Sequence, residues 1–200
     1  MTQGEGLTHS LAEAAARLAT ISDTPRLDAE LLMAHALGIE REAMLLNARR
    51  LAVPGAFAGL IERRMAHEPV AYIIGYRDFW TVRIAVAPGA LIPRPDSETL
   101  IDAAIAHFGD AGPATILDLG TGPGTLLIAA LDSWPDARGT GVERSAIARA
   151  QAEGNVAANG MADRATIMAG DWHDAPQMRG LGLFDLILCN PPYVEDSADL

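Results

Sequence analysis

The 200-residue chain has no lysine and a single cysteine, Cys189. One cysteine cannot form an internal disulfide, and no cysteine and histidine cluster has zinc-site spacing, so we expect no bound metal. The longest apolar runs fall far short of the ~18 residues that span a membrane. The first seven residues contain no arginine, unlike the basic start of a signal peptide. These absences predict a cytoplasmic protein without a membrane anchor, in which Cys189 is a small buried hydrophobic residue.

Positive charge is scarce as well. All 15 basic residues are arginines, against 26 aspartates and glutamates, which gives a formal net charge of −11. Residues 1–79 hold 10 acids and 8 arginines, whereas residues 80–200 hold 16 acids and 7 arginines. The second part, at a net −9, repels the phosphate backbone that usually dominates nucleic-acid affinity. We therefore expect no direct nucleic-acid partner, although a basic protein partner is compatible with this charge.

Half of the residues are hydrophobic, which is typical of a globular chain. The first 70 residues show the spacing of short amphipathic helices, since Leu11, Ala14 and Leu18 fall on one helical face. Pro25 is a suitable first residue for a second helix, and Gly38 a suitable stop. Two more helices are predicted over residues 40–51 and from residue 54 to the proline at position 69. This part of the chain predicts a small helical bundle.

The pattern changes after residue 70. Residues 79–86 alternate like a β-strand, and strands are then predicted over 115–119, 138–142, 165–169 and 185–189, with helices over 125–133 and 146–159. Such alternation predicts an α/β fold with a doubly wound, mostly parallel sheet. Four core strands are fewer than the usual ~5–6, so we expect the last strands to be missing from this chain.

We expect three segments on this basis. Residues 1–70 form a helical domain, residues 71–98 a β-hairpin linker with a proline-rich segment, and residues 99–200 an incomplete α/β domain.

A glycine-rich turn follows the first strand of the expected sheet. It reads Asp118-Leu119-Gly120-Thr121-Gly122-Pro123-Gly124, and its glycines allow a sharp turn and close approach to a ligand. A dinucleotide fingerprint needs its third glycine one residue later, which weakens an NAD interpretation. Glu143 ends the next strand, where a carboxylate can bind both ribose hydroxyls. Asp171 and Trp172 follow the third strand, and together they suit an adenine ring.

Residues Asn190-Pro191-Pro192-Tyr193 follow the last predicted strand. The prolines remove two backbone donors and stiffen the turn. The Pro191 carbonyl and the Asn190 side-chain oxygen can then accept both hydrogens of a planar amide or amine nitrogen. Tyr193 can lie over that planar group. This combination favours chemistry on a planar nitrogen.

These motifs, in this order, resemble a class I S-adenosylmethionine-dependent methyltransferase. The segment from Ala71 to Glu98, with Leu91-Ile92-Pro93-Arg94-Pro95-Asp96-Ser97-Glu98, is similar to the peptide chain release factor N5-glutamine methyltransferases (HemK/PrmC). The sequence departs from that family in two ways: Pro123 stands where Ser or Thr is common, and Glu143 replaces a more usual Asp. The family also continues for roughly 80 residues more.

The resemblance implies a Rossmann-like methyltransferase sheet and a defined chemistry, with residues 1–70 as the substrate-recognition domain and residues 99–200 as the catalytic domain. S-adenosyl-L-methionine is the cofactor, and the glutamine of a Gly-Gly-Gln motif in a class 1 release factor is the substrate. We also expect a monomer. Its cofactor-binding residues are Gly120, Thr121, Gly122, Pro123, Gly124, Glu143, Asp171, Trp172 and Asn190. The catalytic residues are Asn190, Pro191 and Tyr193, which also bind the substrate together with Pro192. Phe79, Trp80 and Arg94 are expected to shape the substrate mouth.

Three alternatives stay open at this point. A nucleic-acid amino-group methyltransferase would share the Asn-Pro-Pro-Tyr segment, but the negative charge argues against it. An NAD(P) oxidoreductase would need the other glycine spacing. A cofactor-binding module without catalytic activity is compatible with an incomplete sheet.

Overall fold

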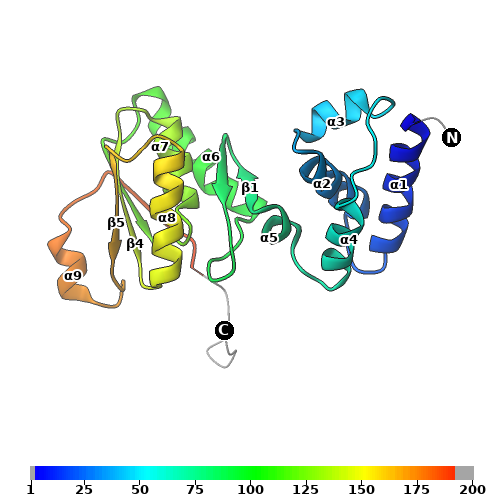
Figure 1. Ribbon diagram of the computed structural model, residues 1–200. Helices are drawn as coiled ribbons and strands as arrows, with labels where there is room; N and C mark the ends of the chain where they lie inside the picture. Colours follow the sequence, from blue (N-terminus) through cyan, green and yellow to red (C-terminus); the bar gives the residue numbers. More distant parts are fainter. Residues whose placement is uncertain (1–2, 192–200) are drawn as a thin grey trace. The chain divides into compact units, whose positions relative to one another are not determined.

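The computed structural model describes residues 3–191, and its contacts divide the chain into two compact units, Met1–Gly75 and Tyr76–Leu200 (Figure 1). The first unit is helical and the second contains all of the described strands. Within the described residues, no helix is both long and apolar enough to cross a membrane.

The helical unit contains α1 (Gln3–Leu18), α2 (Pro25–Leu37), α3 (Arg41–Asn47), α4 (Phe57–Met65) and α5 (Val70–Ile74). The predicted start at Pro25 and stop at Gly38 are confirmed, because Gly38 adopts a left-handed conformation (φ +67°) and its N–H closes the helix. The third and fourth helices are shorter than predicted. The short helix α5 was not expected from the sequence. The core is formed by apolar side chains that are fully buried, among them Leu7, Leu11, Leu32, Met33, Met44 and Ile61.

Two acidic residues on α2 are also buried in this unit. Asp28 accepts a 2.8 Å hydrogen bond from Nε of Arg64 on α4, and Glu30 accepts one of 2.6 Å from Arg41 on α3. Arg26, one turn before Glu30, binds its other oxygen. Burial alone would raise the pKa of Glu30, but the hydrogen bonds from Arg26 and Arg41 outweigh it and hold that pKa below its usual value. These ion pairs therefore join α2 to both α3 and α4.

A two-stranded antiparallel hairpin, β1 (Tyr76–Phe79) and β2 (Val82–Ala85), begins the second unit. The strand predicted over residues 79–86 is thus two strands, which the turn at Trp80 and Thr81 separates. Trp80 has a left-handed backbone (φ +54°), an uncommon conformation that the tight turn imposes. Phe79 packs into the interior with 2% of its surface exposed.

The main sheet is parallel and has the strand order β5-β4-β3-β6. Its strands are β3 (Thr115–Leu119), β4 (Arg138–Glu143), β5 (Ala165–Ala169) and β6 (Leu186–Cys189). The helices of this unit are α6 (Glu98–Phe108), α7 (Thr125–Ser133), α8 (Ala146–Ala158) and α9 (Ala175–Gly180), with short 3₁₀ turns at Pro95–Ser97 and Gly109–Ala111. The predicted alternation of strands and helices is confirmed, and α9 is an addition.

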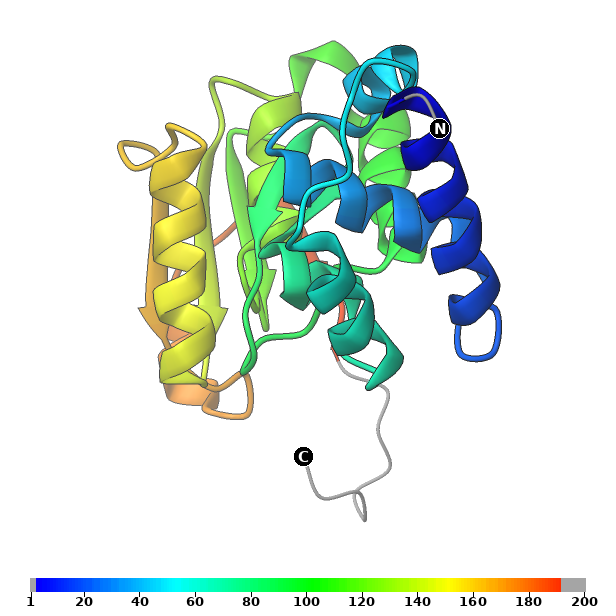
Figure 2. The same cartoon turned by 45° about the vertical axis from the view of Figure 1, so that its right-hand side comes forward.

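Helices α7 and α8 connect β3 to β4 and β4 to β5, stepping across the sheet in one direction. Right-handed crossovers place both helices on the same face, and Figure 2 shows α8 lying along β4 and β5. Gly139 of β4 permits close packing here, since a Cβ atom at that position would lie 2.5 Å from the Leu127 side chain of α7. On the opposite face, Ile187 is 57% exposed.

The expectation that Cys189 is buried is wrong, because its side chain is exposed. It alternates to the same face as Ile187, away from α7, while Leu188 between them is 4% exposed. β6 is also the last strand at its end of the described sheet.

Three side-chain amides, two on α8 and one on the residue directly after it, bond the outer edge of β2 and the segment that follows it. Gln151 accepts a hydrogen bond from the Ala87 N–H, and Asn155 both accepts from Ala85 N–H and donates to Ala85 C=O. Asn159 donates to the carbonyl of Arg83. We call Gln151, Asn155 and Asn159 the amide row. The second Asn155 N–H bonds the Pro123 carbonyl at 2.8 Å, which ties the hairpin to the glycine-rich turn.

Candidate functional site

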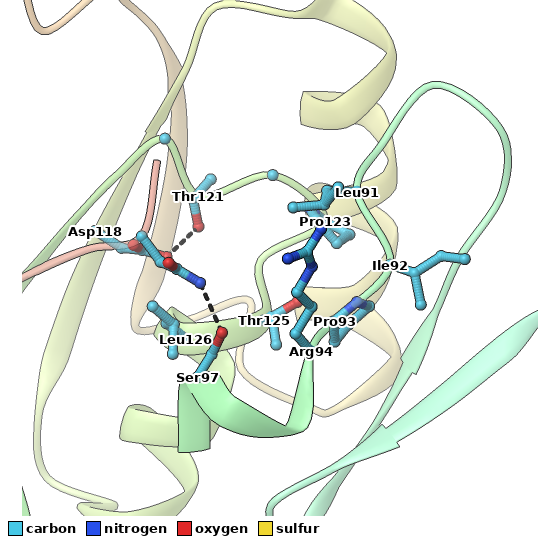
Figure 3. Close-up of a pocket in the computed structure, with 13 residues that line it drawn as sticks. Leu91, Ile92, Pro93, Arg94, Ser97, Asp118, Thr121, Pro123, Thr125 and Leu126 are labelled. Atoms are coloured by element: carbon cyan, nitrogen blue, oxygen red, sulfur yellow. Dashed lines mark hydrogen bonds between the residues drawn. The ribbon is translucent and has the colours of Figure 1, made fainter. Parts of the chain in front are cut away.

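The carboxyl ends of β3 and β6 lie side by side because these strands are parallel neighbours. After β3 the chain moves to β4 on one side, whereas β6 occupies the other side. Open α/β sheets bind ligands in the crevice at this kind of switch point. A small cleft of about 60 Å³ is present there (Figure 3), and it is lined by Leu91, Ile92, Pro93, Arg94, Ser97, Asp118, Gly120, Thr121, Gly122, Pro123, Thr125, Leu126 and Asn190.

The glycine-rich turn forms one wall of the cleft. The N–H groups of Gly120 and Thr121 both bond the carbonyl of Val142, and the Gly124 N–H bonds Thr121 C=O. Gly122 N–H bonds the carboxylate of Glu143 at 3.1 Å. A phosphate-binding loop points such N–H groups at its ligand. In this turn, the N–H groups of Gly120, Thr121, Gly122 and Gly124 bond acceptors within the protein, so they are not available to bind phosphate. This arrangement disfavours the dinucleotide alternative.

The glycines of the turn have different roles. Gly120, Gly122 and Gly124 all have positive φ angles, +70°, +56° and +89°. A Cβ atom at Gly122 would meet nothing within 4 Å, so this position faces open space. A Cβ atom at Gly124 would lie 3.0 Å from Ile128 and 3.5 Å from Ala152, so this glycine allows α7 to pack against α8.

Asp118 is buried beneath the turn, with 1% of its surface exposed. Its carboxylate accepts a 2.6 Å hydrogen bond from the Thr121 hydroxyl and a 3.3 Å bond from the Leu127 N–H (Figure 3 shows the Thr121 contact). Burial raises the pKa of Asp118 to about 6, which these hydrogen bonds oppose and the nearby Glu143 reinforces. Asp118 is the first residue of the glycine-rich motif, but the sequence alone predicted no role for its side chain.

Glu143 ends β4 beside the turn. One carboxylate oxygen accepts from Gly122 N–H and the other accepts from Ser145 N–H at 2.8 Å. A carboxylate offers about four lone-pair sites, so two stay available for hydroxyl groups of a ligand. The predicted ribose ligand therefore also fixes the shape of the turn.

Trp172 covers the turn from the β5 side. A Cβ atom at Gly120 would lie 2.5 Å from the Trp172 ring, so the ring and the glycine backbone are in close contact. Trp172 as a whole is 37% exposed. The Asp171 carboxylate accepts a 2.9 Å bond from the His173 N–H, while the Trp172 indole N–H donates to the His173 imidazole. Glycine turn, carboxylate and aromatic ring are thus adjacent, as the sequence predicted from three strand ends.

Asn190 follows β6 on the other side of the cleft. Its side-chain N–H donates a 2.6 Å hydrogen bond to the Ser97 hydroxyl oxygen (Figure 3). Pro191 is half-buried directly after it. Pro192 and Tyr193 lie outside the described residues.

Of the side chains expected at the substrate mouth, Arg94 lines the cleft. Phe79 does not, because it belongs to the hairpin core. Trp80 instead offers a backbone N–H to the Glu98 carboxylate at 3.0 Å. Sequence reasoning missed Ser97 and Asn155 as contacts of the site, since each meets a residue far away in the chain. Within the part of the chain that the structure describes, no group of three or more histidine, cysteine or acidic side chains is arranged to hold a metal ion.

Comparison with known proteins agrees with this geometry. The PrmC N-terminal domain model matches residues 9–75, and the methyltransferase small domain model matches residues 97–200. The chain is 42% identical over 181 residues to the release factor glutamine methyltransferase of Rhodospirillum rubrum, covering 89% of this chain and 54% of the relative.

Two further relatives carry the same name. The protein of Aliivibrio fischeri is 37% identical, over 87% of this chain and 61% of the relative. The protein of Bradyrhizobium diazoefficiens is 36% identical, over 96% of this chain and 65% of the relative. The chain thus spans between about half and two thirds of the length of these relatives. The two domain matches and the similarity over most of this chain show that it belongs to the HemK/PrmC family of methyltransferases.

Proposed function

We propose that this chain transfers the methyl group of S-adenosyl-L-methionine to the side-chain amide nitrogen of the Gly-Gly-Gln glutamine in a class 1 peptide chain release factor. The observation that carries this proposal is the position of Asn190, a side-chain amide at the switch point, across one cleft from the glycine-rich turn. The names of the relatives, release factor glutamine methyltransferase, support the same substrate.

The described residues fit this cofactor. The open space at Gly122, which lines the cleft, suits its methionine part. The unused lone pairs of Glu143 suit the ribose hydroxyls. Trp172, partly exposed and beside Gly120, suits the adenine, together with Asp171. The bound group supplies a methyl that is electrophilic because it is attached to a sulfonium.

The chain's own residues then act on the glutamine amide. Its nitrogen is a poor nucleophile, because the lone pair is delocalised into the carbonyl. The Asn190 side-chain oxygen and the Pro191 carbonyl would accept its two hydrogens, which orients the nitrogen toward the methyl. Orientation of this kind can supply much of a rate enhancement. Tyr193 would lie on the amide plane.

No strong base is needed, since the nitrogen becomes acidic as it is alkylated. Asp118 is therefore given no proton-transfer role, and its bonds to Thr121 and Leu127 support the turn instead. The formal net charge of −11 suits a basic segment of a protein substrate better than a nucleic acid. We propose that the enzyme works as a monomer in the cytoplasm.

Mass spectrometry of a purified class 1 release factor, incubated with this chain and S-adenosylmethionine, tests the proposal. We expect a gain of one CH₂ unit on the Gly-Gly-Gln glutamine. Asn190→Ala should reduce the rate by ~100-fold or more, by analogy with loss of one group from an oxyanion site. Its affinity for the cofactor should stay within a few-fold. An unmodified glutamine at saturating cofactor, or full activity of Asn190→Ala, would overturn the proposal.

A further inference from the structure

The Asn190 amide is anchored by a residue that lies 93 positions earlier in the chain. The Ser97 hydroxyl oxygen accepts a 2.6 Å hydrogen bond from the Asn190 side-chain nitrogen. Both residues line the cleft, and Ser97 is 8% exposed. This contact has no part in the function proposed above.

Ser97 is itself held firmly. It ends the 3₁₀ turn Pro95–Ser97, and its N–H bonds the Arg94 carbonyl at 3.0 Å. Prolines at positions 93 and 95 restrict the backbone before it. On its other side, the Thr99 hydroxyl bonds the Asp96 carbonyl at 2.7 Å. A side chain on such a segment can fix the direction of a partner.

The direction of the Asn190 amide decides whether it can serve the reaction. One end of an asparagine amide carries an oxygen acceptor and the other carries two N–H donors. A glutamine amide nitrogen brings two N–H groups to the site, so only the oxygen end of Asn190 can receive one of them. An asparagine turned the other way would present donors to donors.

We propose that Ser97 is a positioning residue that holds the Asn190 side chain in place at the cleft. In the observed orientation Ser97 accepts a hydrogen bond from the nitrogen end, which leaves the oxygen end of Asn190 to accept from the substrate. The Leu91–Ser97 segment thus acts on the substrate through Asn190. This inference rests on the proposed function for its purpose, but the orientation itself does not require activity.

The test compares Ser97→Ala with Ser97→Thr in the full chain. Loss of the hydroxyl should lower kcat for methyl transfer by about ten- to a hundred-fold, as loss of an outer hydrogen-bond partner does at other sites. The cofactor Kd and the Tm should be unchanged. Ser97→Thr keeps a hydroxyl and should restore kcat. Ser133→Ala removes a hydroxyl at the end of α7 that is remote from the cleft, and should leave kcat unchanged.

A second measurement separates this inference from the proposed function. In ¹⁵N-asparagine-labelled protein, the Asn190 side-chain NH₂ signals, assigned by their loss in Asn190→Ala, should shift in Ser97→Ala but keep their positions in Ser97→Thr. If the wild-type chain methylates release factor and Ser97→Ala does so at an equal kcat, the inference is wrong while the proposed function stands. If no release factor is methylated, the proposed function fails, and unshifted Asn190 signals in Ser97→Ala would overturn the inference separately.

Discussion

The two units of the chain bury carboxylates in opposite ways. In the helical unit, Asp28 and Glu30 lie against arginines from α3 and α4. In the sheet unit, Asp118 is bound by a hydroxyl and a backbone N–H, with no arginine ion pair among the described residues. The pKa of Glu30 is accordingly held below its usual value, whereas burial raises that of Asp118 to about 6.

This difference distinguishes buried acids that stabilise the fold, such as Asp28 and Glu30, from a buried acid at the candidate site, Asp118. An acid with an arginine partner stays ionised and responds little to its surroundings. An acid buried without a cation is sensitive to small changes around it, and such groups gather at functional sites. Asp118 lies at the cleft, where its carboxylate supports the glycine-rich turn through Thr121. The comparison can be tested by changing one partner at a time.

The largest effect is expected in the helical unit. Arg64→Met leaves the Asp28 carboxylate, 9% exposed at its side chain, with only the Ser22 and Thr24 hydroxyls. Removing one partner of a buried ion pair costs about 3–5 kcal/mol. Urea denaturation followed by circular dichroism should show this loss in the free energy of unfolding. Adding Asp28→Asn should recover part of it, because a neutral amide needs no cation. Equal stability of the single and double variants would contradict this account.

A somewhat smaller effect is expected from pH in the sheet unit. The Asp118 pKa is about 6 in the folded protein against 3.8 ordinarily, so the folded state binds this proton more tightly. Its contribution to stability is complete below pH ~4 and is lost as pH rises through 6. That amounts to about 2 kcal/mol between pH 4 and 7. Asp118→Asn should lack this loss when unfolding is measured at several pH values.

Glu30→Gln is a control, because the pH dependence that Glu30 gives to stability has the opposite sign to that of Asp118. Because the folded-state pKa of Glu30 is lowered, its contribution is present above the ordinary pKa and disappears as pH falls. The two variants should therefore differ from wild type in opposite pH ranges. Parallel pH profiles for Asp118→Asn and wild type would show that Asp118 is not buried in this way.

Cofactor affinity gives the next effect. Glu143→Ala should weaken S-adenosylmethionine binding by about 1–3 kcal/mol, because ribose hydroxyls lose their acceptor. The structure adds that the Gly122 and Ser145 N–H groups lose their partner too. Isothermal titration calorimetry measures the change, and NADH should not compete. Unaltered affinity would remove Glu143 from the cofactor site.

The smallest effect should come from an exposed ion pair. Arg17 of α1 and Glu62 of α4 lie 2.7 Å apart, but their side chains are 48% and 64% exposed. Exposed pairs contribute about 0–1 kcal/mol. Arg17→Met should thus change the free energy of unfolding by less than 1 kcal/mol in the assay used for Arg64→Met. A loss as large as that of Arg64→Met would show that burial is not the deciding factor.

Features with a local cause could be predicted from the sequence. Pro25 and Gly38 bound a helix through their own backbone preferences, and the glycine-rich turn lies where its residues predicted. The neighbouring positions of Glu143 and Trp172 also followed, since parallel strands end at one edge of a sheet. The contacts between Ser97 and Asn190 had no signal, because they join residues 93 positions apart.

Other misses have the same origin. The exposure of Cys189 depends on which face of the sheet the described helices cover. The raised pKa of Asp118 depends on burial beneath a turn whose amides are used internally. The exposure of Cys189 and the raised pKa of Asp118 both depend on tertiary structure, so the sequence pattern alone could not predict them.

The spacing of the amide row along the helix matches the spacing of its partners along the hairpin strand. Successive members are four residues apart, a rise of about 6 Å along a helix. Their backbone partners, on β2 and just after it, are two residues apart, about 6.6 Å along an extended chain. The two spacings are close enough for three successive contacts, but the small difference between them would add up over a longer row. A shift of β2 by one residue would offer the row the groups that bond β1 instead. One inserted residue between Arg83 and Ala87 should therefore break the match, and with it the spacing between the hairpin and the glycine-rich turn that Asn155 sets.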